Sequence, residues 1–477
     1  MNLARRSITS ISWNFAANLV VVVILAVRMI LLTRWLSPQI FGTYAFAYAI
    51  VVITAIVPNF GMGQAFIHRA LQTENEQDAA AVHFTLRLTF TLVWAALLLV
   101  ATLLLTDGDL QVTLLVIVPV SFGIQMTQTP SLILRRRVSH KRLATVNFVE
   151  VILTTIVALS LAWRGAGLWA LLATDIVSLL VKGSILYLWR PFWKPQLLWT
   201  SRLVRYYLRF GSRAFIADAL SSALDRIDDL WVGIFLGPSA LGIYSRAYTF
   251  ATYPRKLLAA PVTAVAGGMY AELKEDRLGL SQAFFRVNAF LIRAGFLLAG
   301  SLALVAPEII LLLGEQWQDM LTPFRLMLLF ILLDPVRLTI GLLFMAVGQP
   351  HRLAQARFVQ LFVLIIGLVL LGTTWGVNGV ALAVDSMLLA GISIMLRQAR
   401  PFVDFSIWRL FSVPLLAIGI ALSITFLVLR TVPLQNMWLE ALIKLLIFNA
   451  TYLIIWLNLE RSEARRMFRA FRLVIGR

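Results

Sequence analysis

Long apolar stretches recur along this chain of 477 residues, separated by short polar segments. A helix needs about 20 predominantly apolar residues to cross the hydrocarbon core of a bilayer. Hydrophobic residues make up 60% of the chain and charged residues 14%, whereas soluble domains carry about 25% charge. The sequence therefore predicts an all-α membrane protein that crosses the bilayer many times.

Fourteen stretches have the length and composition of a transmembrane helix. They cover residues 12–33, 39–61, 82–105, 112–133, 143–162, 167–189, 211–235, 239–264, 283–304, 321–346, 354–373, 377–396, 410–429 and 438–457. The first is longer than the apolar region of a signal peptide, so we interpret it as a retained span. The chain contains no cysteine, which excludes disulfides, thiolate catalysis and Cys-ligated metal, and the four scattered histidines predict no metal site.

Lysine and arginine are distributed unequally between alternate connections. With the amino terminus in the cytoplasm, 27 of the 42 Lys and Arg residues lie in cytoplasmic segments and three in outer loops. Cytoplasmic loops of membrane proteins carry such an excess. The pattern predicts that both termini are cytoplasmic, and it accounts for the net charge of +19 without a nucleic-acid partner.

Two basic segments, residues 197–210 and 461–477, combine arginines with aromatic and apolar residues. This composition is typical of amphipathic helices that lie on an anionic membrane surface. We expect both segments on the inner leaflet, with binding to a partner protein as the alternative.

A short phrase occurs twice in the chain, 200 residues apart. "LSPQIFGTYAFA" at residues 36–47 and "LGPSALGIYSRA" at residues 236–247 share Leu, Pro, Gly, Tyr and Ala at matching positions. Each phrase joins an odd-numbered predicted span to the next one. The proline suits the first turn of the second helix, and the glycine allows two helices to approach closely.

A second correspondence, "KRLATVNFVEV" at 141–151 and "HRLAQARFVQL" at 351–361, extends the repeat. Spans one to six therefore resemble spans seven to twelve, in the same orientation, because six is even. The repeat predicts two parallel six-helix lobes around a central cavity, related by a pseudo-two-fold axis along the membrane normal. The predicted divisions are 1–196, then 197–400 with the interfacial helix, and 401–477 with two extra helices and a tail.

These phrases, together with residues 225–265, resemble the bacterial polysaccharide transporter family over about residues 8–400. This family contains the O-antigen and exopolysaccharide flippases of the multidrug/oligosaccharidyl-lipid/polysaccharide (MOP) superfamily. The resemblance implies a bacterial inner-membrane protein that moves an undecaprenyl-pyrophosphate-linked oligosaccharide from the inner to the outer leaflet. It also implies a cationic central cavity, coupling to H⁺ or Na⁺ without another cofactor, and partners among polysaccharide-assembly membrane proteins. A small-molecule or drug/cation antiporter of the same superfamily is the alternative.

Charged residues inside a membrane are costly and usually face a bundle interior or a cavity. Arginines inside predicted spans are candidates for holding the substrate's pyrophosphate, because a guanidinium donates two parallel hydrogen bonds to phosphate oxygens. They are Arg28, Arg226, Arg246, Arg293 and Arg337. The candidates for ion coupling are the carboxylates Asp218, Asp225, Asp229, Asp334, Glu150 and Asp385.

A purely structural role is the competing interpretation of these charges. At about 100° per residue, Asp218, Asp225 and Asp229 share one helix face, where Arg226 and Arg28 could neutralise them. Arg226 is spaced to pair with Asp229, and Asp334 with Arg337, three residues apart in each case.

An enzyme is the third class of function, and the sequence disfavours it. Polytopic glycan polymerases and transferases need a sizeable loop or domain that carries catalytic groups. The longest outer connection here is about residues 305–320, and no paired carboxylates stand in a cytoplasmic loop. We therefore expect a transporter without catalytic residues.

Overall fold

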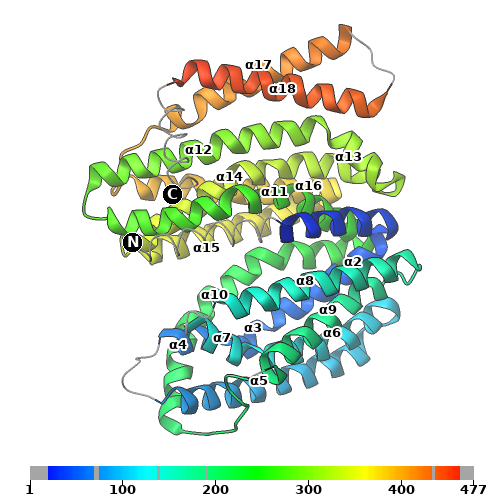
Figure 1. Cartoon of the computed structure of the whole chain (residues 1–477), viewed down its shortest axis with the longest axis vertical. Helices are drawn as coiled ribbons and strands as arrows, with labels where there is room; N and C mark the ends of the chain where they lie inside the picture. The colour runs from blue at the N-terminus through cyan, green and yellow to red at the C-terminus, as the bar shows by residue number, and fades with distance from the viewer. Residues whose placement is uncertain (1–19, 69–74, 137–139, 190, 432–435, 462–477) are drawn as a thin grey trace. The chain divides into compact units, whose positions relative to one another are not determined.

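A computed structural model of the chain describes residues 20–68, 75–136, 140–189, 191–431 and 436–461. Every regular element in these residues is a helix (Figure 1). Contacts between Cα atoms divide the chain into two compact units, residues 21–245 and residues 246–477 with 1–20. The three predicted divisions, which were set by the repeat, stay a prediction.

The unit over residues 21–245 begins with a helix over residues 20–35. Its further helices are α2 (Pro38–Thr54), α3 (Ile56–Asn59), α4 (Met62–His68), α5 (Glu76–Leu105), α6 (Gly108–Met126), α7 (Gln128–Arg136), α8 (His140–Trp163), α9 (Trp169–Gly183) with the π-helical turn Ser184–Leu188, and α10 (Ser201–Phe235). The helix α11 (Gly237–Glu272) starts in this unit and continues into the other.

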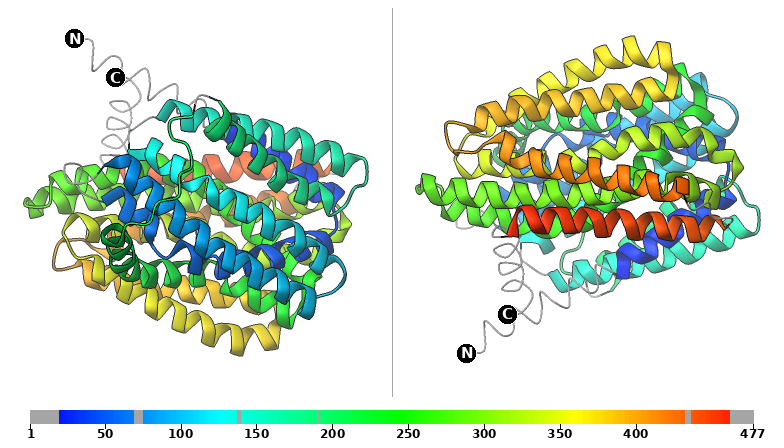
Figure 2. Two further views of the ribbon diagram at one scale, coloured as in Figure 1. Left: turned by 90° about the horizontal axis from the view of Figure 1, so that it is seen from below. Right: turned by 90° about the horizontal axis from the view of Figure 1, so that it is seen from above.

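The unit over residues 246–477 contains the remaining helices. They are α12 (Arg277–Leu304), α13 (Ala306–Leu313), the 3-10 turn Glu315–Met320, α14 (Leu321–Ala346), α15 (Pro350–Gly367) with the π-helical turn Leu368–Gly372, α16 (Thr373–Ala399), α17 (Ile407–Thr431) and α18 (Met437–Leu459). Within each unit the long helices run roughly alongside one another (Figure 2).

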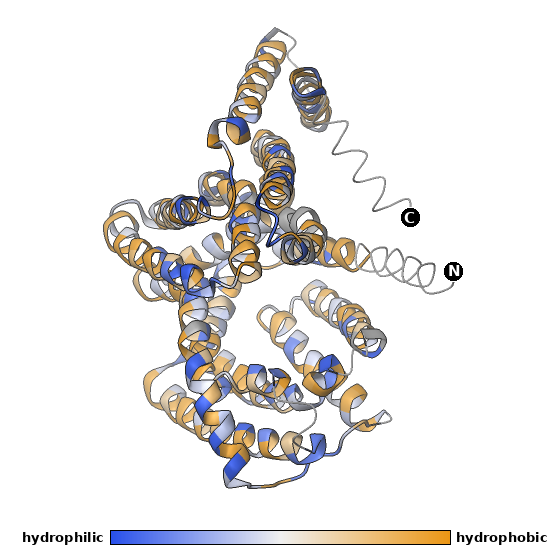
Figure 3. Ribbon diagram, turned by 90° about the vertical axis from the view of Figure 1, so that its left-hand side faces the viewer, coloured by the Kyte–Doolittle hydropathy of each residue, from blue (hydrophilic) through white to orange (hydrophobic). Residues whose placement is uncertain are grey.

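Ten helical segments in the described ranges are long and apolar enough to cross a membrane. Hydrophobic residues make up most of the length of the long helices (Figure 3). One segment, Pro350–Ala399, covers two predicted spans. The chain turns between them at Gly376, which has a φ of 54°. The more highly charged helices α10 and α11 are not among the ten. A helix overlaps each of the fourteen predicted stretches, whereas the number of crossings stays a prediction.

In the basic segment 197–210, the helical part from Ser201 buries its apolar side in protein, whereas Leu197 and Trp199 before the helix are exposed, and a position on the inner leaflet stays a prediction. Leu203, Val204 and Tyr207 are buried in a core with Met62 and Phe66 from α4. Arg202, Arg205 and Arg209 are exposed on the other side of α10. The apolar half of this amphipathic helix is therefore bound by protein. The second basic segment, 461–477, lies outside the described residues except for Arg461.

The repeated phrase marks a close crossing of two helix starts. In α2, Ser37 caps the first turn by accepting a hydrogen bond from the Ile40 amide at 3.4 Å, and Pro38 occupies the first turn as predicted. A Cβ atom at Gly42 would overlap the carbonyl oxygen of Pro238, and one at Gly242 would overlap that of Pro38. Glycine is thus required twice, at matching positions of the repeat, for the two backbones to touch.

Gly42→Ala and Gly242→Ala are each expected to lower the stability of the protein. A methyl group at either position has to push apart two backbones, and overpacking of this kind costs about 1–3 kcal/mol. The melting temperature of the purified protein in detergent measures the effect. Gly183→Ala is the control, because no atom lies within 4 Å of the added methyl group. Equal melting temperatures for all three variants would contradict the close crossing.

Candidate functional site

A polar cavity of about 730 Å³ lies inside the unit over residues 21–245. Helices α2 to α10 all contribute to its wall, from Tyr48 to Ser222. Its charged lining residues are Arg87, Arg135, Glu150, Asp175, Lys182 and Asp218. Because polar side chains in a membrane bundle face its interior or a water-filled space, this cavity is the candidate functional site.

Amide and hydroxyl side chains fill much of the wall between these charges. The amides are Asn59 in α3, Gln64 in α4, Gln125 in α6 and Gln128 in α7. Serines from α6, α9 and α10 also line the cavity. Amides offer both donors and acceptors, which match the hydroxyl groups of a sugar.

Arg87 is the most deeply buried cation of the cavity wall, with an exposure of 4%. Its Nε donates to the backbone carbonyl of Gln125 at 3.2 Å, and its Nη2 donates to the side-chain oxygens of Asn59 and Gln125. All three acceptors are neutral. Arg87 was not among the candidates predicted from the sequence. The sequence feature that could have indicated it is the spacing of four between His83, Arg87 and Thr91, which places three polar residues on one buried face of α5.

A second group of charges on the cavity wall is already neutralised. The Nζ of Lys182 lies 2.8 Å from the Oε1 of Glu150, which also accepts a hydrogen bond from Ser178. Asp175 accepts one from the hydroxyl of Tyr44, the repeated tyrosine, at 2.9 Å. Glu150, predicted for ion coupling, therefore lies on the cavity wall in an ion pair that joins α8 to α9.

Arg28, a predicted substrate-binding residue, lies beside this group. Its Nη1 donates to Thr154 in α8 at 3.1 Å, and Asp175 and Glu150 are its carboxylate neighbours. In the described part of the chain the carboxylates near Arg28 are thus these two and not those of α10. The alternative that placed Arg28 against the α10 carboxylates was wrong.

The carboxylates of α10 are distributed over three environments. Asp218 lines the cavity, whereas Asp225 is exposed. Asp229 is buried and pairs with Arg226 at 2.8 Å, which confirms the predicted pairing. The guanidinium of Arg226 also lies 5.1 Å from the ring of Tyr48, a cavity residue.

The remaining candidates belong to the unit over residues 246–477. Arg246 is half-buried in α11. Arg337 pairs with the fully buried Asp334 at 2.7 Å, which confirms the predicted pair within α14. Asp385 is buried in α16, and its Oδ1 has no hydrogen-bond partner among the described residues. A role of these residues in substrate binding or ion coupling stays a prediction.

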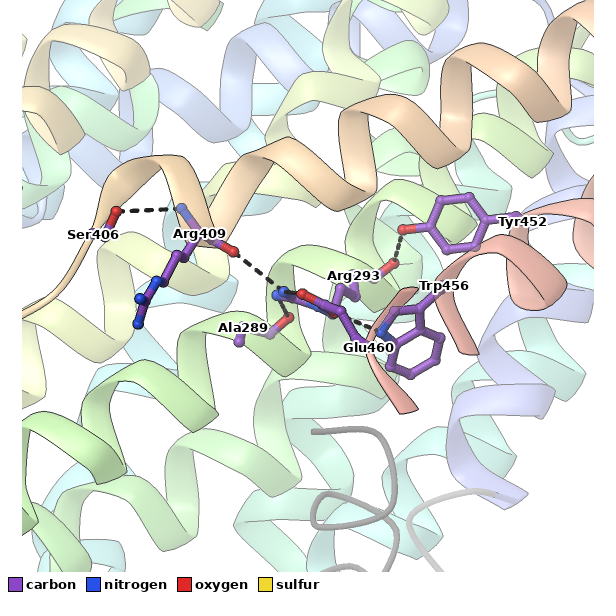
Figure 4. Close-up of polar contacts among 7 residues, drawn as sticks. All are labelled: Ala289, Arg293, Ser406, Arg409, Tyr452, Trp456 and Glu460. Carbon is purple, nitrogen blue, oxygen red and sulfur yellow. Dashed lines mark hydrogen bonds and ion pairs between the residues drawn. The ribbon is translucent and has the colours of Figure 1, made fainter. Parts of the chain in front are cut away.

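Arg293 is held in a closed polar cluster (Figure 4). Its exposure is 1%, and its guanidinium pairs with Glu460 at the end of α18. It also donates to the carbonyl oxygens of Ala289 at 2.9 Å and Arg409 at 3.3 Å, and Trp456 donates to Glu460 at 3.0 Å. The structure thus gives Arg293 a role in joining α12, α17 and α18.

The comparison with known protein families assigns the chain to one of them. A family model described as polysaccharide biosynthesis protein matches residues 31–322, more than half of the chain. The chain belongs to this family.

Two relatives of this family member carry names from polysaccharide biosynthesis. The succinoglycan biosynthesis transport protein ExoT of Rhizobium meliloti (strain 1021) is 27% identical over 297 residues, which are 60% of this chain and 58% of ExoT. The lipopolysaccharide biosynthesis protein WzxC of Escherichia coli (strain K12) is 23% identical over 403 residues, which are 80% of this chain and 78% of WzxC. The chain therefore aligns with less than two thirds of the length of ExoT.

Solved structures of two transporters show the same fold. The lipid II flippase MurJ in an inward closed conformation matches with a TM-score of 0.77 at 16% identity, over 94% of this chain and 99% of MurJ. An inward-facing multidrug resistance MATE family transporter of the MOP superfamily matches with a TM-score of 0.61 at 16% identity, over 80% and 94% of the two chains. This family member thus has the fold of these two transporters.

Glu460→Gln is expected to destabilise the protein by about 3–5 kcal/mol, because it leaves the buried guanidinium of Arg293 without its partner, and Arg293→Gln is expected to cost less, because the half-buried Glu460 stays partly hydrated. The double substitution is expected to recover part of that loss. Melting temperatures of the four proteins in detergent form the required cycle. If Arg293→Gln left the melting temperature unchanged while it abolished substrate binding, the structural role would be wrong.

Proposed function

We propose that this chain is a flippase for an undecaprenyl-pyrophosphate-linked oligosaccharide. It moves this substrate from the inner to the outer leaflet of a bacterial inner membrane by alternating access, coupled to a gradient of H⁺ or Na⁺. The family, the names of its relatives and the multi-pass helical fold support a transporter for polysaccharide precursors.

The polar cavity is the observation that carries this proposal. An oligosaccharide head group cannot cross hydrocarbon without replacement partners for its water. The amide and hydroxyl wall supplies neutral partners, and Arg87 and Arg135 supply positive charge. Arg135 is exposed at the end of α7 and has no ion pair in the ranges that the structure covers.

The antiporter alternative predicts a cavity dominated by carboxylates. The observed wall contains three cations and three carboxylates: Arg87, Arg135 and Lys182, and Glu150, Asp175 and Asp218. Carboxylates therefore do not dominate the wall, and two of its three cations, Arg87 and Arg135, have no carboxylate partner among the described residues. This balance favours the flippase.

The predicted candidates fit this scheme at different sites. Glu150 and Asp218 line the cavity, and protonation or Na⁺ binding there would change its charge. Arg28 and Arg226 lie next to cavity residues and could bind phosphate oxygens when their carboxylates are neutralised.

We also propose that both termini face the cytoplasm, in accord with the distribution of lysine and arginine.

Depletion of the protein is expected to trap undecaprenyl-linked repeat units on the inner leaflet and to reduce surface glycan. Protection of the lipid-linked sugar from an external glycosidase measures the first effect, and chemical analysis of surface polysaccharide the second. Complementation with the unaltered chain is the control. Normal surface glycan in a deletion strain without a paralogue would contradict the proposal, and efflux of small cations by the purified protein would favour the antiporter.

A further inference from the structure

Arg87 is a buried cation whose protein partners are all uncharged. It is 4% exposed and lies within the long apolar helix α5. A buried charge is normally compensated by an opposite charge, because its removal from water is costly. Asn59 and Gln125 satisfy hydrogen bonds of the guanidinium but leave its charge uncompensated.

The other cations of the cavity wall lack this combination of features. Lys182 is paired with Glu150, and Arg135 is exposed and can be hydrated. In the described part of the cavity wall, Arg87 alone is both buried and without a carboxylate partner.

The orientation of the guanidinium is fixed by three acceptor atoms from two elements, α3 and α6. Asn59 at the end of α3 and Gln125 near the end of α6 accept hydrogen bonds from Nη2, and the Gln125 carbonyl accepts from Nε. Nη1 has no partner in the residues that the structure describes. Arg87 lines the cavity with Nη1 free to donate, and an arginine fixed in this way is preorganised for an oxyanion.

We infer that Arg87, held by Asn59 and Gln125, forms a subsite of the cavity that binds one oxyanion of the substrate's head group. This inference rests on the proposed function. It adds Arg87 to the substrate-binding residues, and Arg87 was not among those predicted from the sequence. Two sources can supply the oxyanion: a carboxylate on a sugar of the oligosaccharide, or a phosphate of the lipid carrier.

Asn59→Asp tests the subsite without removing the arginine. It places a carboxylate at an atom that already accepts a hydrogen bond from Arg87, so it supplies internally the negative charge that the ligand would bring. We expect it to weaken binding of the oxyanion at least tenfold while the melting temperature stays equal or rises. Gln125→Glu does the same from α6 and provides an independent version if Asn59→Asp folds poorly.

Binding is measured on the full chain in lipid nanodiscs with three probes. They are an oligosaccharide that carries one uronate, its neutral counterpart, and farnesyl diphosphate. Gln196→Glu, at an exposed position outside the cavity, controls for added negative charge.

Each result has a defined meaning. Weaker binding of the uronate probe alone assigns the oxyanion to the glycan, weaker binding of farnesyl diphosphate alone assigns it to the lipid carrier, and both together support a subsite open to either. If the unaltered protein binds neither anionic probe, or if both substitutions leave its affinities unchanged, the inference is wrong. The assay needs no translocation, so its failure is distinguishable from failure of the depletion experiment.

Discussion

The absence of water inside a bilayer is the constraint on which this structure depends. Each backbone group has to be satisfied within the protein, which requires helices, and each charge has to find a partner or a polar space. The described charges follow this rule in two ways. Arg226, Arg337 and Arg293 are each neutralised by a carboxylate. Arg226 and Arg337 each find it on their own helix, and Arg293 finds it on another element of the fold. The charges around the cavity instead share a polar chamber in which a ligand can complete their environment.

Some cations of this structure are paired with a carboxylate and others are not, and this difference connects the fold to the proposed function. A closed pair stabilises one arrangement of helices and offers little to a substrate. Arg87 and Arg135 have no carboxylate partner in the described ranges, so their charge is available to the contents of the cavity. The neutral side chains around Arg87 keep it in place without consuming its charge. A transporter of anionic head groups needs cations of this second kind.

The sequence predicted the helices well, because membrane spans are encoded in local composition. It also predicted the two ion pairs with a spacing of three, since helix geometry alone brings Arg226 to Asp229 and Asp334 to Arg337. Contacts between distant residues could not be predicted. The pairs Glu150–Lys182, Tyr44–Asp175 and Arg293–Glu460 depend on how helices pack, which apolar composition does not specify. Arg87 was missed because its partners are amides, which carry no charge pattern. The repeat did indicate that its glycines serve close approach, although not that each meets the other copy of the phrase.

The cluster around Arg293 shows how the last two helices are integrated. α18 supplies Glu460 to Arg293, and its Lys444 pairs with Glu308 of α13 at 2.5 Å, while Asn449 accepts a hydrogen bond from Ser301 of α12. α18 and the residue that follows it are therefore joined to α12 and α13 at three points by polar groups. A chain truncated before residue 437 would leave the buried guanidinium of Arg293 and the buried carboxylate of Glu308 without their partners, so α18 is as much a part of the folding unit as any repeated helix. Reporter fusions that follow residue 461 leave these bonds in place, whereas shorter fragments forfeit them.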